Sequence, residues 1–340
     1  MSKKNSNVRS LKSTFIENNK LSKIYLNFKS ILETTINKKP FVVSVSGGPD
    51  SLALVALSKM YQYEKKTKVF FTLIDHGIRT NSKKEANLVK KLLKKKRIDL
   101  KIIKNNESIE KNIQKNARMI RYKLLAEYSI NKKVQFILTG HHSDDQIETF
   151  LIRLSRGSGI QGLSSMNKIS RFNKKIKIFR PLLDFKKKDL ILIAKKIFGK
   201  FIKDPSNKDK KYLRTRIRSL RKELEKSGIH HNQIIKSINN LASTRDTLND
   251  YITKVVESCV KKKKNETLIN LKKLFLEPNE IKLKTLGLAI RDFSKTYYPP
   301  RSKKVLNALK RLNSPKRVKL TLAGCFLEKS GDYLSIRKEV

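Results

Sequence analysis

The stretch Phe41-Val-Val-Ser-Val-Ser-Gly-Gly-Pro-Asp-Ser51 decides the fold of this chain. Its first five residues are mostly β-branched or aromatic, which is typical of a buried strand. Two glycines then permit a tight turn, and a helical pattern follows as far as Tyr63. This order of strand, glycine-rich turn and helix N-terminus predicts an anion site, because backbone N–H groups and the helix dipole converge there.

The polar residues of this turn indicate which anion it holds. Hydroxyl groups and glycine N–H groups suit phosphate oxygens. A carboxylate at Asp50 would repel phosphates unless a cation lay between them, so we expect Asp50 to bind Mg²⁺. An ordinary capped turn is the alternative, since Gly-Gly-Pro-Asp-Ser also suits a turn and a helix N-cap. The candidate ligands of a nucleotide phosphate are Ser46, Gly47, Gly48, Pro49, Asp50 and Ser51.

Short apolar runs alternate with longer helical patterns from residue 41 to about residue 140. This alternation predicts an α/β domain, in which helices cover a parallel sheet. Ligands of such open sheets bind at the carboxyl ends of the strands, so the functional residues should gather there. The predicted strands are 41–45, 69–74, 100–103 and 136–139, and the predicted helices between them are 50–63, 84–95 and 108–130.

A loop-like stretch with the sequence Asp-Pro-Ser-Asn, within residues 203–211, marks the approach to a domain boundary. We therefore predict an N-terminal extension with a helix over 1–35, an α/β domain over 36–213 and a basic, mainly helical domain over 214–340. The last domain should contain helices at 234–256, 268–275 and 284–293, and should close with a two-stranded hairpin of 318–327 and 333–337.

Composition points to a polyanionic partner. The chain has 79 Lys and Arg residues against 29 Asp and Glu residues, a formal net charge of +50, which favours nucleic acid. A general lysine bias is the alternative explanation. The first 23 residues resemble no export signal and the apolar runs are too short to cross a bilayer, so we expect a cytoplasmic protein with no membrane partner. Cys259 and Cys325 form no C-x-x-C pair, which argues against a disulfide framework or zinc site.

Two further clusters of polar residues stand out. One follows the second predicted strand, and the other lies on the third predicted helix. Asp75-His76 comes directly after the strand 69–74, at the end where nucleotide contacts are expected, although a lone histidine there is more often structural. Arg118, Arg121 and Tyr122 are three and four residues apart on one helix. Arginine can clamp phosphates or a carboxylate and can stack on a base. A solvated basic helix face is the alternative for this second cluster.

The segment from Thr139 to Leu163 is the most distinctive one, because it concentrates acids in a basic chain. If a helix begins at Ser143 or the next residue, its carboxylates share faces at spacings of three and four residues. Such carboxylates can bind a metal, hold an ammonium group or deprotonate an amine. Adjacent histidines do not readily face one metal, so we rank a metalloenzyme below binding of an amine substrate. The candidates here are His142, Asp144, Asp145, Glu148, Thr149 and Arg153.

Four ordered motifs resemble those of the tRNA(Ile)-lysidine synthetase family, within the N-type ATP pyrophosphatases. They are S-G-G-x-D-S from Ser46, D-H-G-[IL]-R from Asp75, A-R-x-x-R-Y from Ala117 and H-H-x-D-D-Q-x-E-T-F-L from His141. The resemblance covers residues 41 to about 218. It departs at Lys203, where the family usually has an acid, and at Thr215, where it usually has Asn. The chain is also shorter than other members, and we expect it to lack part of their C-terminal tRNA-binding region.

The resemblance implies an α/β adenine-nucleotide α-hydrolase-like (PP-loop) domain and a specific reaction. ATP with Mg²⁺ would adenylate the 2-oxo oxygen of the wobble cytidine in the CAU anticodon of tRNA(Ile), with release of pyrophosphate. The ε-amine of free L-lysine would then displace AMP to give lysidine. The sequence does not predict the oligomeric state, and a homodimer is compatible with it. The residues expected in catalysis are Asp50, Arg118, Asp145 and Glu148; those expected to contact ATP include Asp75 and His76; and those expected to contact tRNA or lysine are Arg121, Tyr122, His142, Asp144, Asp145, Glu148, Thr149 and Arg153.

Three other functions are weighed against this one. A tRNA thiolase on the same ATP-binding fold needs catalytic or cluster-binding cysteines, which Cys259 and Cys325 do not provide. A non-catalytic RNA-binding protein would need basic charge alone and has no reason for polar clusters at strand ends. A small-molecule amidating enzyme of the same superfamily has no reason for so basic a chain.

Overall fold

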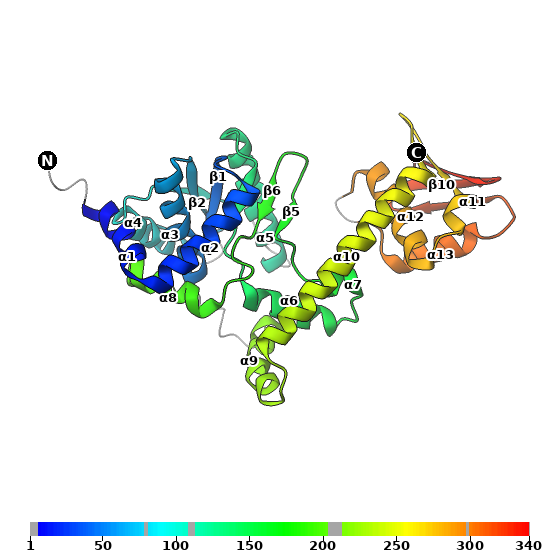
Figure 1. The fold of residues 1–340 in the computed structure, drawn as a ribbon. Helices are drawn as coiled ribbons and strands as arrows, with labels where there is room; N and C mark the ends of the chain where they lie inside the picture. Colours follow the sequence, from blue (N-terminus) through cyan, green and yellow to red (C-terminus); the bar gives the residue numbers. More distant parts are fainter. Residues whose placement is uncertain (1–5, 78–80, 108–112, 203–212, 297–298, 340) are drawn as a thin grey trace. The chain divides into compact units, whose positions relative to one another are not determined.

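The computed structural model describes residues 6–77, 81–107, 113–202, 213–296 and 299–339 (Figure 1). The predicted loop 203–211 with Lys203, the residue Arg79 and the start of the predicted helix 108–130 lie outside these ranges. By their internal contacts the residues form two compact units, Met1–Leu241 and Ala242–Val340, here called unit 1 and unit 2.

Unit 1 is built on a six-stranded sheet with the strand order β3-β2-β1-β4-β6-β5. Strand β1 lies at its centre, where Phe41 pairs with Val69 on one side and Phe136 on the other. All pairs are parallel except β5 with β6, which confirms the predicted parallel sheet. The strands are β1 (Phe41–Val45), β2 (Val69–Asp75), β3 (Leu100–Lys104), β4 (Phe136–Leu138), β5 (Ile169–Arg171) and β6 (Lys177–Phe179).

The helices of unit 1 cover both faces of this sheet. Because β1–helix–β2 and β2–helix–β3 connections are right-handed, α3 and α4 lie on one face, and α5, which returns the chain to β4, lies on the other. The order in which successive strands are added to the sheet thus reverses between β1 and β4, and this switch point is where open sheets bind ligands. The helices are α3 (Pro49–Lys65), α4 (Ser82–Lys94), α5 (Ile113–Asn131), α6 (Ser143–Leu154), α7 (Ile160–Leu163) and α8 (Lys187–Phe198).

The N-terminal helices α1 (Ser6–Glu17) and α2 (Asn19–Thr35) belong to unit 1. Asn18 caps α2 by accepting a hydrogen bond from the Leu21 N–H at 3.1 Å. Phe15 and Phe28 are almost fully buried in the same apolar core as the central strand. Helices α1 and α2 are therefore part of the α/β unit, because their apolar faces complete its core.

The boundary between the units falls after Leu241 and not after residue 213, where the sequence placed it. The reason is that α9 (Leu213–Lys226) packs against α6, and Ile234 and Ile238 of α10 (His231–Cys259) bury Ile147. Helix α10 has 29 residues and runs from one unit into the other. Neither α10 nor any other helix in the described ranges has the length and apolarity needed to cross a membrane.

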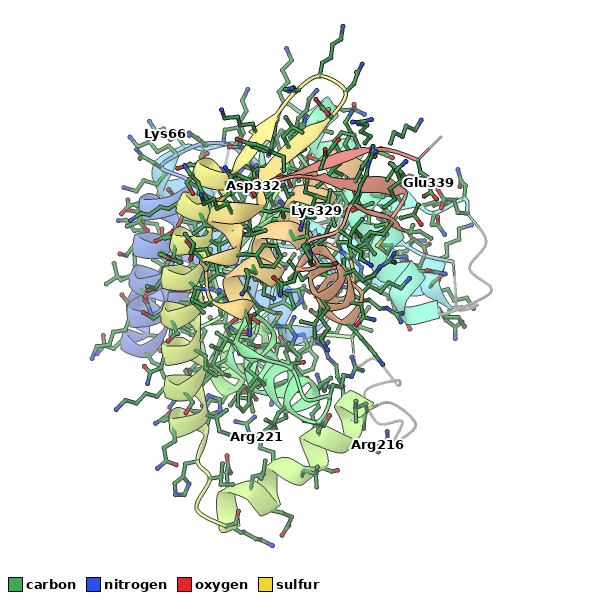
Figure 2. All side chains as sticks on the ribbon, turned by 90° about the vertical axis from the view of Figure 1, so that its right-hand side faces the viewer. Lys66, Arg216, Arg221, Lys329, Asp332 and Glu339 are labelled. Atoms are coloured by element: carbon green, nitrogen blue, oxygen red, sulfur yellow. The ribbon has the colours of Figure 1, made fainter. Side chains whose placement is uncertain are left out.

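Unit 2 contains a five-stranded antiparallel sheet of order β7-β8-β11-β10-β9. The predicted closing hairpin is confirmed as β10 and β11, with Lys329 and Asp332 near its turn (Figure 2). The predicted strand 318–327 is divided by Ala323 and Gly324, which both have positive φ. The elements are β7 (Val260–Lys262), β8 (Thr267–Asn270), α11 (Leu271–Phe275), α12 (Asn279–Ser294), α13 (Ser302–Leu312), β9 (Val318–Leu322), β10 (Cys325–Ser330) and β11 (Tyr333–Lys338).

The predicted helix 268–275 is wrong in its first three residues, which belong to strand β8. Leu268 and Ile269 pair with Ser335 and Leu334 of β11. Pairing with a strand more than sixty residues away decides the conformation of this short segment, which local periodicity could not distinguish. The remaining part, α11, begins after Asn270, whose side chain accepts a hydrogen bond from the Lys273 N–H.

Candidate active site

The turn between β1 and α3 is held by its own serine hydroxyls. The Ser51 Oγ accepts hydrogen bonds from the Ser46 N–H at 3.2 Å and the Ser46 hydroxyl at 3.1 Å, and donates to the Gly48 carbonyl at 3.0 Å. Gly47 has a φ of +83°, and a Cβ there would lie 2.6 Å from Val89. The turn therefore requires glycine at this position. It leads directly into α3, whose first residue is Pro49 and whose N-terminus no side chain caps, the position that an anion-binding turn occupies.

The turn after β4 packs directly on this anion-binding turn. A Cβ on Gly140 would lie 3.1 Å from the carbonyl carbon and oxygen of Asp50, and 3.2 Å from the Ser51 nitrogen. Glycine at this position lets the two strand ends approach each other. The sequence analysis did not single out Gly140; the signal for it was a glycine directly after a predicted strand.

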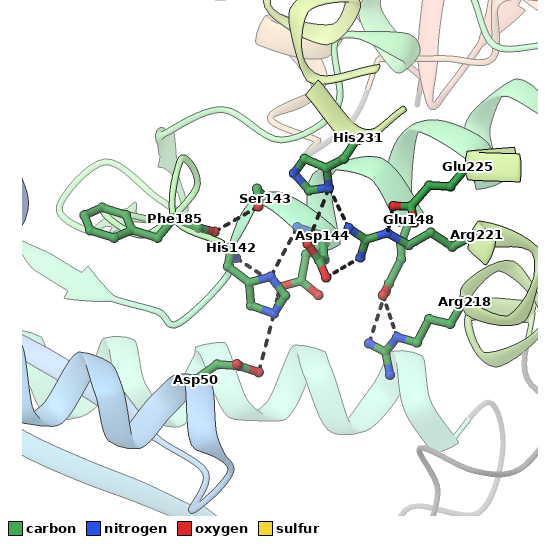
Figure 3. Close-up of polar contacts among 11 residues, drawn as sticks. Asp50, His142, Ser143, Asp144, Glu148, Phe185, Arg218, Arg221, Glu225 and His231 are labelled. Carbon is green, nitrogen blue, oxygen red and sulfur yellow. Dashed lines mark hydrogen bonds and ion pairs between the residues drawn. The ribbon is translucent and has the colours of Figure 1, made fainter. Parts of the chain in front are cut away.

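His142 links the two turns (Figure 3). Its Nε2 lies 3.5 Å from a carboxylate oxygen of Asp50 and 3.5 Å from one of Asp145. Burial pulls the pKa of His142 down, but the Asp50 and Asp145 carboxylates outweigh it and hold the pKa above its usual value. For Asp50, burial acts to raise the pKa, yet the contact with His142 outweighs it and the pKa is lowered. A carboxylate from each turn thus converges on one buried imidazole.

The same histidine starts helix α6. The Asp144 N–H donates to Nδ1 of His142 at 3.2 Å, and the Asp145 carboxylate accepts from the His142 N–H at 3.0 Å. This reciprocal arrangement is a capping box, and it confirms the predicted helix start at Ser143. Since Nδ1 accepts a hydrogen bond, the ring proton of the neutral imidazole lies on Nε2, between the two carboxylates.

The remaining α6 carboxylates are paired with arginines of α9. Arg218 donates to both oxygens of Glu148, and Arg221 binds Asp144 (Figure 3). Because Glu148 is buried, its negative charge would destabilise the fold if Arg218 did not pair with it. The sequence analysis gave no role to Arg218 or Arg221. Their spacing of three residues on one helix face was the signal available, but only the packing of α9 on α6 brings them to the carboxylates.

Two α6 residues predicted to contact substrate differ in their surroundings. Arg153 donates to the backbone carbonyls of Gly162 at 2.6 Å and Ser165 at 2.9 Å, so it holds the segment after α6 in place. Its predicted contact with tRNA or lysine stays a prediction. Thr149 instead keeps a buried hydroxyl oxygen with no hydrogen-bond partner.

A cavity of about 210 Å³ opens beside the anion-binding turn. It is lined by residues from the ends of β1 and β2, from helices α4 and α5, and by Ile202. Ser46, Asp75, His76 and Arg121 are among them. The Arg121 Nε donates to Nε2 of His76 at 3.2 Å. Burial and the Arg121 charge lower the pKa of His76 to about 4. Because arginine can only donate, the neutral ring carries its proton on Nδ1, which is buried without a partner.

Arg118 and Tyr122 lie on a different part of α5. The Arg118 guanidinium stacks 5.1 Å from the centre of the Tyr122 ring, which in turn packs at 6.0 Å against Phe172. Burial lowers the pKa of His141 well below its usual value, and the charges of Arg180, Arg118 and Arg214 add to this effect. Positive charges therefore surround His141, and two of them, Arg180 and Arg214, were not among the predicted site residues.

Comparison with known proteins agrees with this geometry. Residues 18–224 match the model of the PP-loop domain family. A tRNA(Ile)-lysidine synthase from Wolbachia pipientis wMel is 35% identical over 326 residues, which cover 92% of this chain and 75% of the relative. One from Orientia tsutsugamushi is 33% identical over 312 residues, or 87% of this chain and 69% of that relative.

Among solved structures, the U34-tRNA thiolase NcsA from Methanococcus maripaludis resembles this chain with a TM-score of 0.53. The identity is 21%, and the match covers 65% of this chain and 80% of the thiolase chain, so it supports the fold alone. The family match and the extent of the sequence identity, together with the arrangement of the two turns, establish that this chain belongs to the tRNA(Ile)-lysidine synthase family of PP-loop proteins.

Proposed function

We propose that this chain ligates free lysine to carbon 2 of the wobble cytidine in the CAU anticodon of tRNA(Ile), with conversion of ATP to AMP and pyrophosphate. The observation that carries the proposal is the pair of His142 contacts, which place the nucleotide-binding turn next to the α6 carboxylates. A reaction that joins an activated oxygen to an amine needs these two sites side by side.

The first step is the activation of the cytidine. Its 2-oxo oxygen attacks the α-phosphorus of ATP, the bond from that phosphorus to the bridging oxygen breaks, and pyrophosphate leaves. The N–H groups of Gly47 and Gly48 would hold the phosphates, in a turn whose shape the hydroxyls of Ser46 and Ser51 maintain. Arg118, oriented by stacking on Tyr122, would stabilise the negative charge that develops on the α-phosphate.

Asp50 is suited to hold Mg²⁺. One of its oxygens, Oδ1, is buried without a hydrogen-bond partner, and the lowered pKa keeps the carboxylate ionised. Within the described ranges no three His, Cys, Asp or Glu side chains are grouped to hold a metal ion, so phosphate oxygens and water would complete the coordination. When bound, Mg²⁺ would neutralise charge on the phosphates.

The second step is attack by lysine. The ε-ammonium group loses a proton to a carboxylate, its nitrogen bonds to carbon 2, and the carbon–oxygen bond breaks as AMP leaves. Asp144 and Glu148 are ion-paired with arginines, whereas Asp145 contacts the His142 imidazole and backbone. We therefore assign deprotonation to Asp145. Because tRNA and ATP are cytoplasmic, we propose that the reaction takes place in the cytoplasm.

The test is incubation of the purified chain with ATP, Mg²⁺, labelled lysine and tRNA(Ile) with a CAU anticodon. Label should enter the RNA in a one-to-one ratio with AMP, and the same tRNA with a GAU anticodon should remain unlabelled. AMP formation without transfer of lysine would support adenylation by this chain and would show that the nucleophile is not lysine. Absence of both would contradict the proposed function.

A further inference from the structure

A second cavity of unit 1, about 360 Å³ in volume, lies beside the α6 carboxylates and has no role in the reaction described so far. Its walls come from the start of α6, the start of α8, helix α9 and the turn from α9 to α10. Its lining residues, here called the basic pocket, are Asp144, Lys186, Lys187, Lys188, Arg221, Glu225, His230, His231 and Asn232.

The basic pocket has an excess of positive charge. Its four permanent cations are three lysines and Arg221, against the two carboxylates of Asp144 and Glu225. Arg221 binds Asp144 and lies 3.6 Å from Glu225, so it partly neutralises both. Within the described ranges, the ammonium groups of residues 186–188 have no carboxylate within 4.0 Å. Their charge is therefore available to an anionic ligand.

Neutral hydrogen-bond donors add to this charge. Lys186 is the N-cap residue of α8, a helix of 12 residues, and no side chain caps that end, so its first N–H groups and dipole favour an anion. Arg221 donates to Nδ1 of His231 at 2.6 Å. Burial, followed by the Arg221 charge, lowers the pKa of His231. The neutral ring therefore carries its proton on Nε2, which makes it a donor.

The basic pocket borders the reacting groups. Asp144 lines it and is the neighbour of Asp145 on α6. Lys187 lies close enough to Asp50 and His142 for its charge to act on both groups: it favours the lowered pKa of Asp50 and opposes the raised pKa of His142. A wobble base that reaches the nucleotide turn must bring its own backbone phosphates to the same neighbourhood.

We propose that the basic pocket binds a backbone phosphate of the RNA substrate next to the reacting nucleotide, an inference that rests on the proposed function. The pocket thereby fixes the position of the anticodon backbone while the base enters the site. Three cations, an uncapped helix end and an imidazole donor match the oxygens of a phosphodiester. The carboxylate of free lysine is the alternative ligand. It needs only one cation, and the experiment below distinguishes it from a phosphate.

The experiment compares two double charge reversals on the same helix. Lys186→Glu with Lys188→Glu changes exposed lysines of the basic pocket, and Lys195→Glu with Lys196→Glu makes the same change at the exposed other end of α8. The affinity for tRNA(Ile) is measured by filter binding at several salt concentrations, and ATP affinity is measured without RNA. The pocket variant should bind tRNA at least about 10-fold more weakly, with a salt slope smaller by about 1–2. The control variant should stay within about 2-fold of the wild type, and both should bind ATP normally.

Each other outcome has a distinct meaning. Equal loss in both variants would show that net charge alone is responsible, and would overturn the inference. Normal tRNA affinity with a raised KM for lysine would reassign the basic pocket to the lysine carboxylate. If the wild type transfers no lysine but only the pocket variant loses tRNA affinity, the basic pocket binds RNA and the proposed function is wrong. Lys186→Gln with Lys188→Gln is a milder change and should give an intermediate loss of tRNA affinity. It tests the same pocket if the charge-reversal variant does not fold.

Discussion

The His76–Arg121 pair shows how one contact fixes the chemistry of a side chain. Arg121 donates to Nε2, which leaves the proton on Nδ1, a buried atom without a partner in a residue that lines the cavity beside the anion-binding turn. The sequence predicted that His76 lies near the nucleotide. It could not predict the tautomer, because that depends on an arginine 45 residues away in the chain.

His76→Asn should preserve ATP binding, because the Asn amide can replace the Nδ1 donor. His76→Leu, without a donor, should weaken it by about 2–10-fold, the value of one hydrogen bond. Calorimetry with ATP measures both. Equal affinity of the two variants would show that Nδ1 does not contact the nucleotide.

The pKa of His76 also predicts how stability depends on pH. Its value falls from 6.5 to about 4 on folding, so between these values the unfolded chain binds a proton that the folded chain does not. The contribution of His76 is therefore fully present above pH 6.5 and is lost as the pH falls toward 4. Urea denaturation at pH 7 and pH 5 should show a larger loss of stability for the wild type than for His76→Asn. The same loss in both would refute the assigned shift.

Asp145 is the carboxylate whose charge should matter most for lysine transfer. Asp145→Asn retains an oxygen that can accept from the His142 N–H, so α6 and ATP binding should be preserved. Transfer of lysine should fall by at least about 100-fold, because the general base is lost. Single-turnover kinetics with labelled lysine measures this. Unchanged turnover would remove Asp145 from the mechanism.

At the scale of elements, the approach of the β4 turn to the start of α3 is the contact that assembles the site. Gly140→Ala would place a methyl group 3.1 Å from the Asp50 backbone, so α3 or the turn must move. We expect ATP affinity to fall by about 10-fold or more, since small displacements of positioned groups have large effects.

Gly159→Ala is a suitable control for this change. Gly159 has a negative φ of −76°, and a Cβ there would meet no atom within 4 Å. Calorimetry should give the same ATP affinity as the wild type. If Gly140→Ala bound ATP as well as Gly159→Ala does, the close approach of the two turns would have no functional consequence.

At the scale of the whole molecule, the two units have separate apolar cores. Leu327 lies on β10, between β9 and β11, and is fully buried in the core of unit 2, whereas Leu276 of the same unit is 84% exposed. Leu327→Ala should destabilise unit 2 by about 2–5 kcal/mol, because it leaves a cavity. Leu276→Ala should have an effect within about 0.5 kcal/mol.

Hydrogen exchange followed by mass spectrometry distinguishes the units. In Leu327→Ala, peptides of residues 260–339 should exchange faster, whereas peptides of β1 and α3 should retain their protection and ATP should still bind. Loss of protection in β1 as well would show that the two cores unfold as one.

The sequence by itself determined the α/β sheet, the anion-binding turn and the start of α6. In each case residues that are adjacent in the chain carry the information: an apolar run, two glycines, or a capping residue before a helix. The same local logic predicted the hairpin of β10 and β11 and failed for Leu268–Asn270, whose strand conformation depends on a distant partner.

The tertiary structure alone decided which charges meet. The pairing of Glu148 with Arg218, the bridge from Asp50 through His142 to Asp145 and the basic pocket all join segments far apart in the chain. No periodicity records such contacts, because their formation depends on the packing of α9 on α6 and of the β4 turn on α3. The sequence therefore supplied the candidate residues of the site, and the fold decided their partners and protonation.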